Sequence, residues 1–114
     1  MVRNIASINH ITNEISDRVR IVLGDRLRKI ILYGSYARGD SDAESDIDIM
    51  VLADLSNEEL EKMEKALWDI GWETGSEHDI MVSVFLKNTS HFFEWMDAMA
   101  YYRNINEDGV VLYG

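Results

Sequence analysis

A strand ending in Gly34-Ser35 and separated by ten residues from Asp46-x-Asp48 is the feature that most limits what this chain can fold into. Gly34 and Ser35 follow the apolar run at 30–33, so we expect them where a strand gives way to a short helix with free backbone N–H groups. The two aspartates alternate with apolar residues, namely Ile47, Ile49 and Val51. Because successive side chains of a strand point to opposite faces, the carboxylates share one face and the apolar residues enter the core.

This pairing of a turn and two carboxylates is typical of a site for a metal-bound nucleoside triphosphate. Residues two apart in a strand lie about 7 Å from each other, and such oxygen donors can hold one or two Mg²⁺ ions while the turn cradles phosphate. Asp-x-Asp alone is weak evidence, since Asp40-Ser41-Asp42 repeats it in what we interpret as a solvated loop. A P-loop is excluded, because Asp40 stands where that motif requires lysine.

The spacing of these residues resembles the signature of the minimal nucleotidyltransferases of the polymerase-beta type, which the chain matches without a gap at Gly34, Ser35, Asp46 and Asp48. The resemblance covers essentially the whole chain. It implies one minimal nucleotidyltransferase domain over residues 1–114, of the α/β (α+β) class, with a small mixed sheet and helices packed on one face. The family also carries a third carboxylate on a later strand, a place that Asp79 would take at the start of the run 80–86.

The resemblance further implies how the site residues divide the chemistry. Asp46, Asp48 and Asp79 would be the catalytic and metal-binding carboxylates for two Mg²⁺ ions, with Asp79 also able to take the proton of the acceptor. Gly34 and Ser35 would hold the phosphates of ATP.

Arg38 is a candidate phosphate ligand, because it lies one helical turn after Ser35. Its alternative role is to form ion pairs with nearby acids, namely Asp40, Asp42 and Glu44.

Composition narrows the function. With 114 residues and 46% hydrophobic content, the chain can bury a modest core but has no room for an acceptor-binding domain. A net charge of −10 disfavours direct binding of DNA or RNA and favours a basic protein partner, although acidity also serves solubility. No cysteine is present, and the N-terminus resembles neither a signal peptide nor a membrane span, so we expect a cytoplasmic protein.

The resemblance favours one function over two alternatives. In the favoured one, the protein is the antitoxin of a two-gene pair, an adenylyltransferase that moves AMP from ATP onto a tyrosine of a HEPN-type RNase toxin and forms a hetero-oligomer with it. The first alternative is nucleotide transfer to a small molecule such as an aminoglycoside, and the second is a non-catalytic antitoxin that neutralises by contact. The sequence leaves open the acceptor, the preferred base and the stoichiometry.

The spacing of apolar residues, together with glycines and a capping box, predicts the remaining helices and strands. We expect a first helix that Gly24 ends, a helix from the capping box at 56–59 to Gly71, and a last helix over 90–103. Predicted strands cover 27–33, 46–52, 79–86 and 110–113. Helices would cover one sheet face and leave the other, with its carboxylates, open to a ligand. For the aromatic residues of the last helix, core and protein interface are equally favoured for Trp95, Tyr101 and Tyr102.

Overall fold

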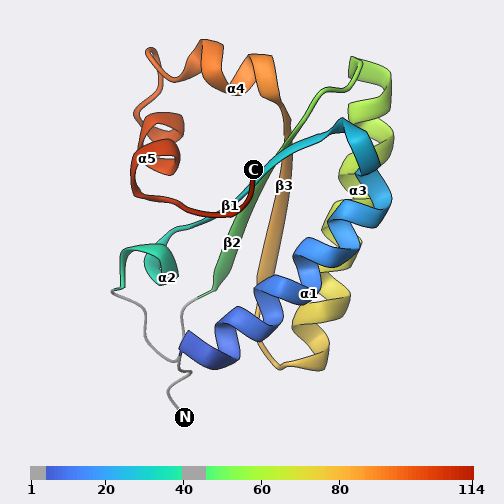
Figure 1. Ribbon diagram of the computed structural model, residues 1–114, viewed down its shortest axis with the longest axis vertical. Coiled ribbons are helices and arrows are strands. Elements are labelled where there is room, and N and C mark those ends of the chain that lie inside the picture. The colour runs from blue at the N-terminus through green and yellow to red at the C-terminus, as the bar shows by residue number, and fades with distance from the viewer. Residues whose placement is uncertain (1–4, 40–45) are drawn as a thin grey trace.

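The protein, seen here in a computed structural model, is described for residues 5–39 and 46–114 (Figure 1). Most of the loop predicted between the motifs, residues 40–45, therefore lies outside the described residues. The elements follow one another as α1 (Ile5–Leu23), η1 (Gly24–Arg26), β1 (Leu27–Tyr33), α2 (Ser35–Arg38), β2 (Ile47–Ala53), α3 (Asn57–Glu77), β3 (Val82–Asn88), α4 (Thr89–Trp95), α5 (Ala100–Asp108) and β4 (Val110–Tyr113). In the described part of the chain, no helix is long and apolar enough to cross a membrane.

The four strands form one mixed sheet in the order β3-β2-β1-β4. Strand β1 runs antiparallel to both β2 and β4, whereas β2 and β3 are parallel and joined through α3. The predicted mixed sheet is therefore confirmed, as are the strand at 27–33 and the short terminal strand at 110–113.

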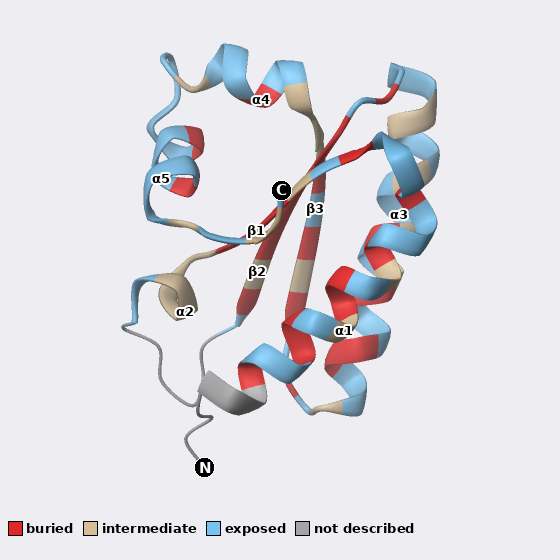
Figure 2. Cartoon of the chain, in the orientation of Figure 1, coloured by how far each residue is buried: buried red, intermediate tan, exposed pale blue. Residues whose placement is uncertain are grey.

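Helices α1 and α3 pack side by side on one face of the sheet (Figure 1). The buried stripe of α1 recurs at helical spacing, and the inward side chains of β2 belong to the same core. Figure 2 shows the buried parts of both elements in red. Its fully buried members include Ile15, Val19, Ile47, Ile49, Val51 and Leu67. The alternation predicted for the second strand is thus confirmed, because its isoleucines and valine face this core.

The opposite face is not open along its whole length, which corrects the expectation from sequence. Helices α4 and α5 lie over part of it (Figure 1) and form a second buried cluster of Ile31, Met50, Leu52, Phe92, Tyr102 and Ile105. The reason lies in β2 itself. Met50 and Leu52 share the face of Asp48, and apolar side chains of this size must be covered.

The predicted last helix is broken into α4 and α5 around residues 96–99. No glycine or proline marks the break, and the N–H groups of Ala98 and Met99 both bond to the carbonyl of Trp95. The turn brings both helices onto the same sheet face. Of the aromatic residues left open by the sequence, Tyr102 is core, while Trp95 and Tyr101 are 43% and 50% exposed.

Helix α3 continues beyond its predicted end at Gly71 and stops at Glu77. Gly71 is a contact point instead, since a Cβ there would lie 2.9 Å from both the carbonyl oxygen of Val82 and a methyl group of Val84. The helix is stopped by Asp79, which takes the left-handed conformation with φ 53°. The Ile80 N–H then bonds to the carbonyl of Gly75, an arrangement that closes many helices.

Gly71→Ala is therefore expected to lower the free energy of unfolding by about 1–3 kcal/mol, the usual cost of overpacking. Helix propensity alone would predict a gain of about 1 kcal/mol. Chemical denaturation distinguishes the two, with Ser76→Ala on the exposed side of α3 as the control. A stabilised Gly71→Ala variant would mean that α3 does not approach β3 this closely.

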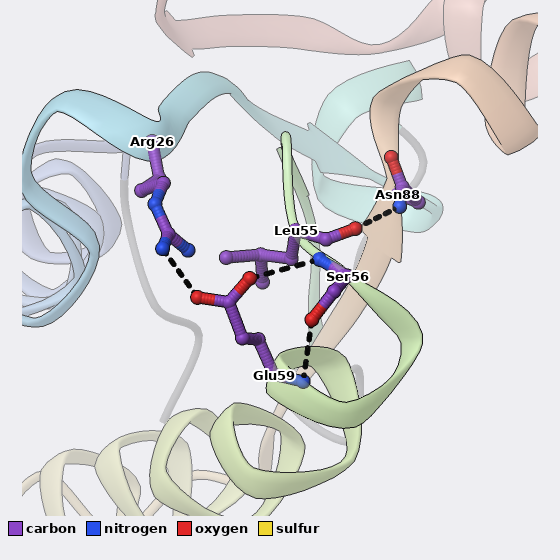
Figure 3. Close-up of polar contacts among 5 residues, drawn as sticks. All are labelled: Arg26, Leu55, Ser56, Glu59 and Asn88. Atoms are coloured by element: carbon purple, nitrogen blue, oxygen red, sulfur yellow. Dashed lines mark hydrogen bonds and ion pairs between the residues drawn. The ribbon is translucent and has the colours of Figure 1, made fainter.

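The corner between β2 and α3 carries the predicted capping box (Figure 3). The Glu59 N–H bonds to the Ser56 hydroxyl at 3.2 Å, and the Glu59 carboxylate accepts the Ser56 N–H at 3.0 Å. That carboxylate also pairs with Arg26, while the Asn88 side chain donates to the carbonyl of Leu55. Three segments that lie far apart in the sequence are thus tied at the end of the sheet.

The hydrogen bond with Arg26, which has the largest effect, and the bonds with Ser56 lower the pKa of Glu59 from 4.5 to about 2. A lowered pKa contributes stability above the unfolded value, and this is lost as the pH falls toward the folded value. Glu59→Gln should therefore melt below the wild type at pH 6, with a gap that closes between pH 5 and 2. The exposed Glu61→Gln variant is the control in thermal melts. A gap that stays constant with pH would contradict the assignment.

Candidate active site

The first part of the site forms where β1 ends. Gly34 has φ 79° and ψ −157°, a conformation open essentially to glycine alone. A Cβ at Gly34 would lie 2.6 Å from Oδ2 of Asp48, so the backbone of the Gly-Ser turn touches the carboxylate. Register explains this approach, because Tyr33 and Asp48 are direct partners across β1 and β2. The residues of the two sequence motifs are therefore in contact.

Asp48 sits at the boundary between the second core and solvent. It is half-buried, and Asp46 lies exposed just ahead of β2. Burial, followed by the charge of Asp46, raises the pKa of Asp48, and the charge of Arg38 opposes this rise. A partly desolvated carboxylate next to a second one is destabilised by like charge, and a cation relieves that repulsion.

A pocket of about 420 Å³ opens beside these residues. From the predicted site it contains Gly34, Ser35, Arg38 and Asp48. Asp46 does not line it but acts on Asp48 through its charge. The pocket has the size usual for small-molecule sites, and the structure thus brings five of the six predicted residues into one neighbourhood.

Asp79 is the sixth, and it does not lie on a strand. β3 begins at Val82, and Asp79 occupies the turn that ends α3, where it lines a separate hollow with Trp72 and Ser76. The predicted strand start at 79 is wrong, because Asp79 has a left-handed backbone conformation that ends α3 and is incompatible with a strand. In the register of the sheet, the neighbour of Asp48 on β3 is Ser83. The role of Asp79 as a metal ligand stays a prediction.

Arg38 ends α2 and lines the pocket. Its effect on the pKa of Asp48 places its charge close enough to matter there. The acids of its alternative role lie outside the described residues. Arg38 therefore stays a candidate phosphate ligand, because it lines the pocket and the planar donors of a guanidinium fit a phosphate group.

The other wall of the pocket was missed in the sequence. It is a face of α5 formed by Tyr101, Asn104, Ile105 and Asp108. The Tyr101 and Tyr33 hydroxyl oxygens are 2.8 Å apart and share a hydrogen bond. Burial, this bond and the nearby Asp48 all raise the pKa of Tyr33, which keeps its phenol neutral. The sequence shows that these four residues have the i, i+3, i+4, i+7 spacing of one helix face. It does not show which face of the sheet the helix covers.

The carboxylates at and beside this pocket fit a divalent cation. Asp46 and Asp48 offer hard carboxylate oxygens, and burial, followed by the charge of Asp46, raises the pKa of Asp48, a rise that a bound cation would oppose. A different group of potential ligands, formed by Glu14, Glu77 and His78 with ligand atoms within 4.8 Å of one another, shares no residue with the pocket.

Comparison with known sequences agrees with this geometry. The nucleotidyltransferase domain family matches residues 11–110. Over 88 residues, the chain is 32% identical to MJ0604 of Methanocaldococcus jannaschii, which is named as a protein adenylyltransferase by inference, and the alignment covers 77% of this chain and 80% of that protein. MJ0141 of the same organism, named in the same way, is 47% identical over 45 residues, which is 40% of this chain and 46% of that one.

Solved structures show the same fold. A chain from a toxin–antitoxin crystal structure with AMP-PNP matches with a TM-score of 0.58 and 25% identity, covering 90% of this chain and 72% of that one. A chain from the complex of the tri-AMPylated Shewanella oneidensis HEPN toxin with MNT antitoxin matches with a TM-score of 0.52 and 23% identity, covering 93% and 71%.

Proposed function

Because the chain belongs to the nucleotidyltransferase domain family, we propose that it is a Mg²⁺-dependent adenylyltransferase that transfers AMP from ATP to a protein hydroxyl. The acceptor is a tyrosine of a HEPN-type RNase toxin, with which the protein forms a hetero-oligomer as antitoxin. The observation that carries the proposal is the contact between the Gly34 backbone and the Asp48 carboxylate. The contact supports the proposal, because it brings together the turn that would bind phosphate and the carboxylate that would bind metal.

The similar proteins support the substrate and the partner. The relatives are named for adenylyl transfer to protein, and the structural neighbours include one with AMP-PNP and one with an AMPylated HEPN toxin. The charge of −10 supports a protein partner over nucleic acid. Residues 1–114 would act as one domain in the cytoplasm and receive the acceptor from outside.

In the proposed reaction, the acceptor hydroxyl oxygen bonds to the α-phosphorus of ATP. The bond from that phosphorus to the oxygen bridging to the β-phosphate breaks, and pyrophosphate leaves. Asp46 and Asp48 would hold the Mg²⁺ ions, two of them in our proposal, which when bound stabilise negative charge on the entering and leaving oxygens. Gly34, Ser35 and Arg38 hold the phosphates in line with the acceptor. The hydroxyl proton passes to a carboxylate. Asp79 stays the candidate that the sequence suggests for this role, although its turn lines a separate hollow.

The test is incubation of the purified protein with Mg²⁺ and ATP labelled at the α-phosphate in a lysate of its host. We expect label on one small protein and an AMP adduct on a tyrosine by mass spectrometry. An Asp46→Asn/Asp48→Asn double variant should leave the acceptor unlabelled. Label confined to the small-molecule fraction would identify a small-molecule transferase instead, and partner binding without any labelling would identify an antitoxin that acts by contact.

A further inference from the structure

One face of α5 lies along the pocket and is not used by the chemistry proposed above. Its four pocket residues, Tyr101, Asn104, Ile105 and Asp108, are spaced as one stripe of a helix. Ile105 is only 2% exposed and packs in the second core together with Tyr102, so the helix is held firmly in this position. A stripe fixed beside a pocket can present its polar groups to whatever the pocket holds.

The charges of the pocket are divided between its two walls. Arg38 and Asp48 lie on the wall formed by the Gly-Ser turn, where Mg²⁺ would neutralise Asp48 in the proposed function, and Asp108 lies on the α5 wall. A carboxylate repels phosphate, but it accepts hydrogen bonds from hydroxyl groups. Within the described part of the chain, neither Asp108 nor Asn104 has a hydrogen-bond partner that would occupy it. This division of charge would favour a nucleotide whose phosphates face Arg38 and whose sugar faces Asp108.

Tyr101 adds an aromatic ring to the lining of the pocket. Its hydroxyl is held by Tyr33 at 2.8 Å, and the two rings meet edge to face at 89°. The ring is nevertheless 50% exposed. A half-exposed aromatic ring whose hydroxyl is held by a hydrogen bond is suited to stack against a nucleobase.

We propose that this face of α5 binds the nucleoside half of the triphosphate, with Asp108 accepting hydrogen bonds from the ribose hydroxyls and Tyr101 stacking on the base. Asn104, which offers both a donor and an acceptor, bonds to the edge of the base. The proposal rests on the proposed function, since it requires a nucleoside triphosphate in the pocket. In this proposal, the contacts of α5 with the ribose and the base allow the pocket to select nucleotides over other polyphosphates.

Calorimetric titration of the full chain with ATP and with 2′,3′-dideoxy-ATP, both with Mg²⁺, tests the ribose contact. A hydrogen bond to a charged group corresponds to about 10–100-fold in affinity, so the wild type should prefer ATP by about this factor. Asp108→Asn should reduce the preference severalfold or abolish it. The matched control is Glu107→Gln, the same change at an exposed neighbour outside the pocket, which should keep the full preference.

Tyr101→Ala tests the stacking independently. Its affinity for ATP should fall about tenfold, and its affinity for Mg²⁺-tripolyphosphate should match that of the wild type. An unchanged ATP preference in Asp108→Asn would overturn the ribose assignment. Equal loss of ATP and tripolyphosphate binding in Asp108→Asn would also overturn it, because Asp108 would then act on the metal or the phosphates.

The wild type separates this proposal from the proposed function. If it binds tripolyphosphate and ATP equally, the α5 proposal alone is overturned. If it does not bind ATP at all, the proposed function is overturned as well.

Discussion

Asp48→Asn is expected to lower nucleotidyl transfer by about a thousandfold or more while leaving the protein folded. The Asp48 carboxylate is the half-buried member of the pair and touches the Gly-Ser turn, so in the proposed function it would hold the metal next to the phosphate-binding turn. Loss of several kcal/mol of charge stabilisation, taken as about 4 kcal/mol, corresponds to roughly three factors of ten in rate. The measurement is initial-rate transfer from ATP with the acceptor identified by the labelling experiment.

The same Asp48→Asn variant, which should lose activity, should not lose thermal stability at pH 7. Burial raises the pKa of Asp48 above its usual 3.8, so the folded protein binds this proton more tightly than the unfolded chain does. The resulting stability is present at low pH and is lost as the pH rises through the folded pKa. Asparagine cannot ionise, so Asp48→Asn should melt at or above the wild type at pH 7 without added metal.

The control for this pair of effects is Asp97→Asn, which removes an exposed carboxylate outside the pocket. It should change neither the transfer rate nor the pH dependence of melting. An Asp48→Asn variant that retained transfer would remove this carboxylate from the metal site. A variant that melted well below the wild type at pH 7 would mean that Asp48 serves the fold rather than the chemistry.

The half of the site that could be predicted from sequence is the half that depends on local rules. Strand alternation alone predicts that Asp48 lies on one face and Ile47 in the core, and both are found there, whereas Asp46 lies just ahead of the strand rather than in it. The turn at Gly34 follows from the end of an apolar strand. The register that sets Tyr33 opposite Asp48 depends on pairing between strands, yet it only tightens an arrangement already implied by the motif.

The half that could not be predicted depends on tertiary packing. The break between α4 and α5 has no glycine or proline to mark it, so the sequence predicts a single helix there. Gly71 resembles a helix stop, but its lack of a side chain serves contact with β3. Asp79 in turn resembles the start of a strand, whereas its backbone stops α3. In each case, residues with a strong local preference were used for a contact that the local sequence does not reveal.

Gly34→Ala should reduce transfer by about a hundredfold or more and destabilise the protein by about 1–3 kcal/mol. The backbone at Gly34 lies in a region that costs alanine about this much. The added Cβ must also displace the Asp48 carboxylate, because it would lie 2.6 Å from Oδ2. Displacement of a metal ligand by even about 1 Å can cost two factors of ten in rate. Transfer assays and chemical denaturation of the same preparation measure both effects.

Gly39→Ala separates strain from contact. Gly39 also has a positive φ, 80°, but a Cβ there would meet nothing within 4 Å among the described residues. This variant should therefore lose about 1 kcal/mol of stability from the left-handed backbone and retain transfer close to the wild-type rate. If both glycine variants lost activity equally, the flexibility of the turn rather than its contact with Asp48 would be the catalytic requirement. If Gly34→Ala alone fails, the close approach of backbone and carboxylate is what the enzyme needs, and any side chain at Gly34 is excluded for that reason.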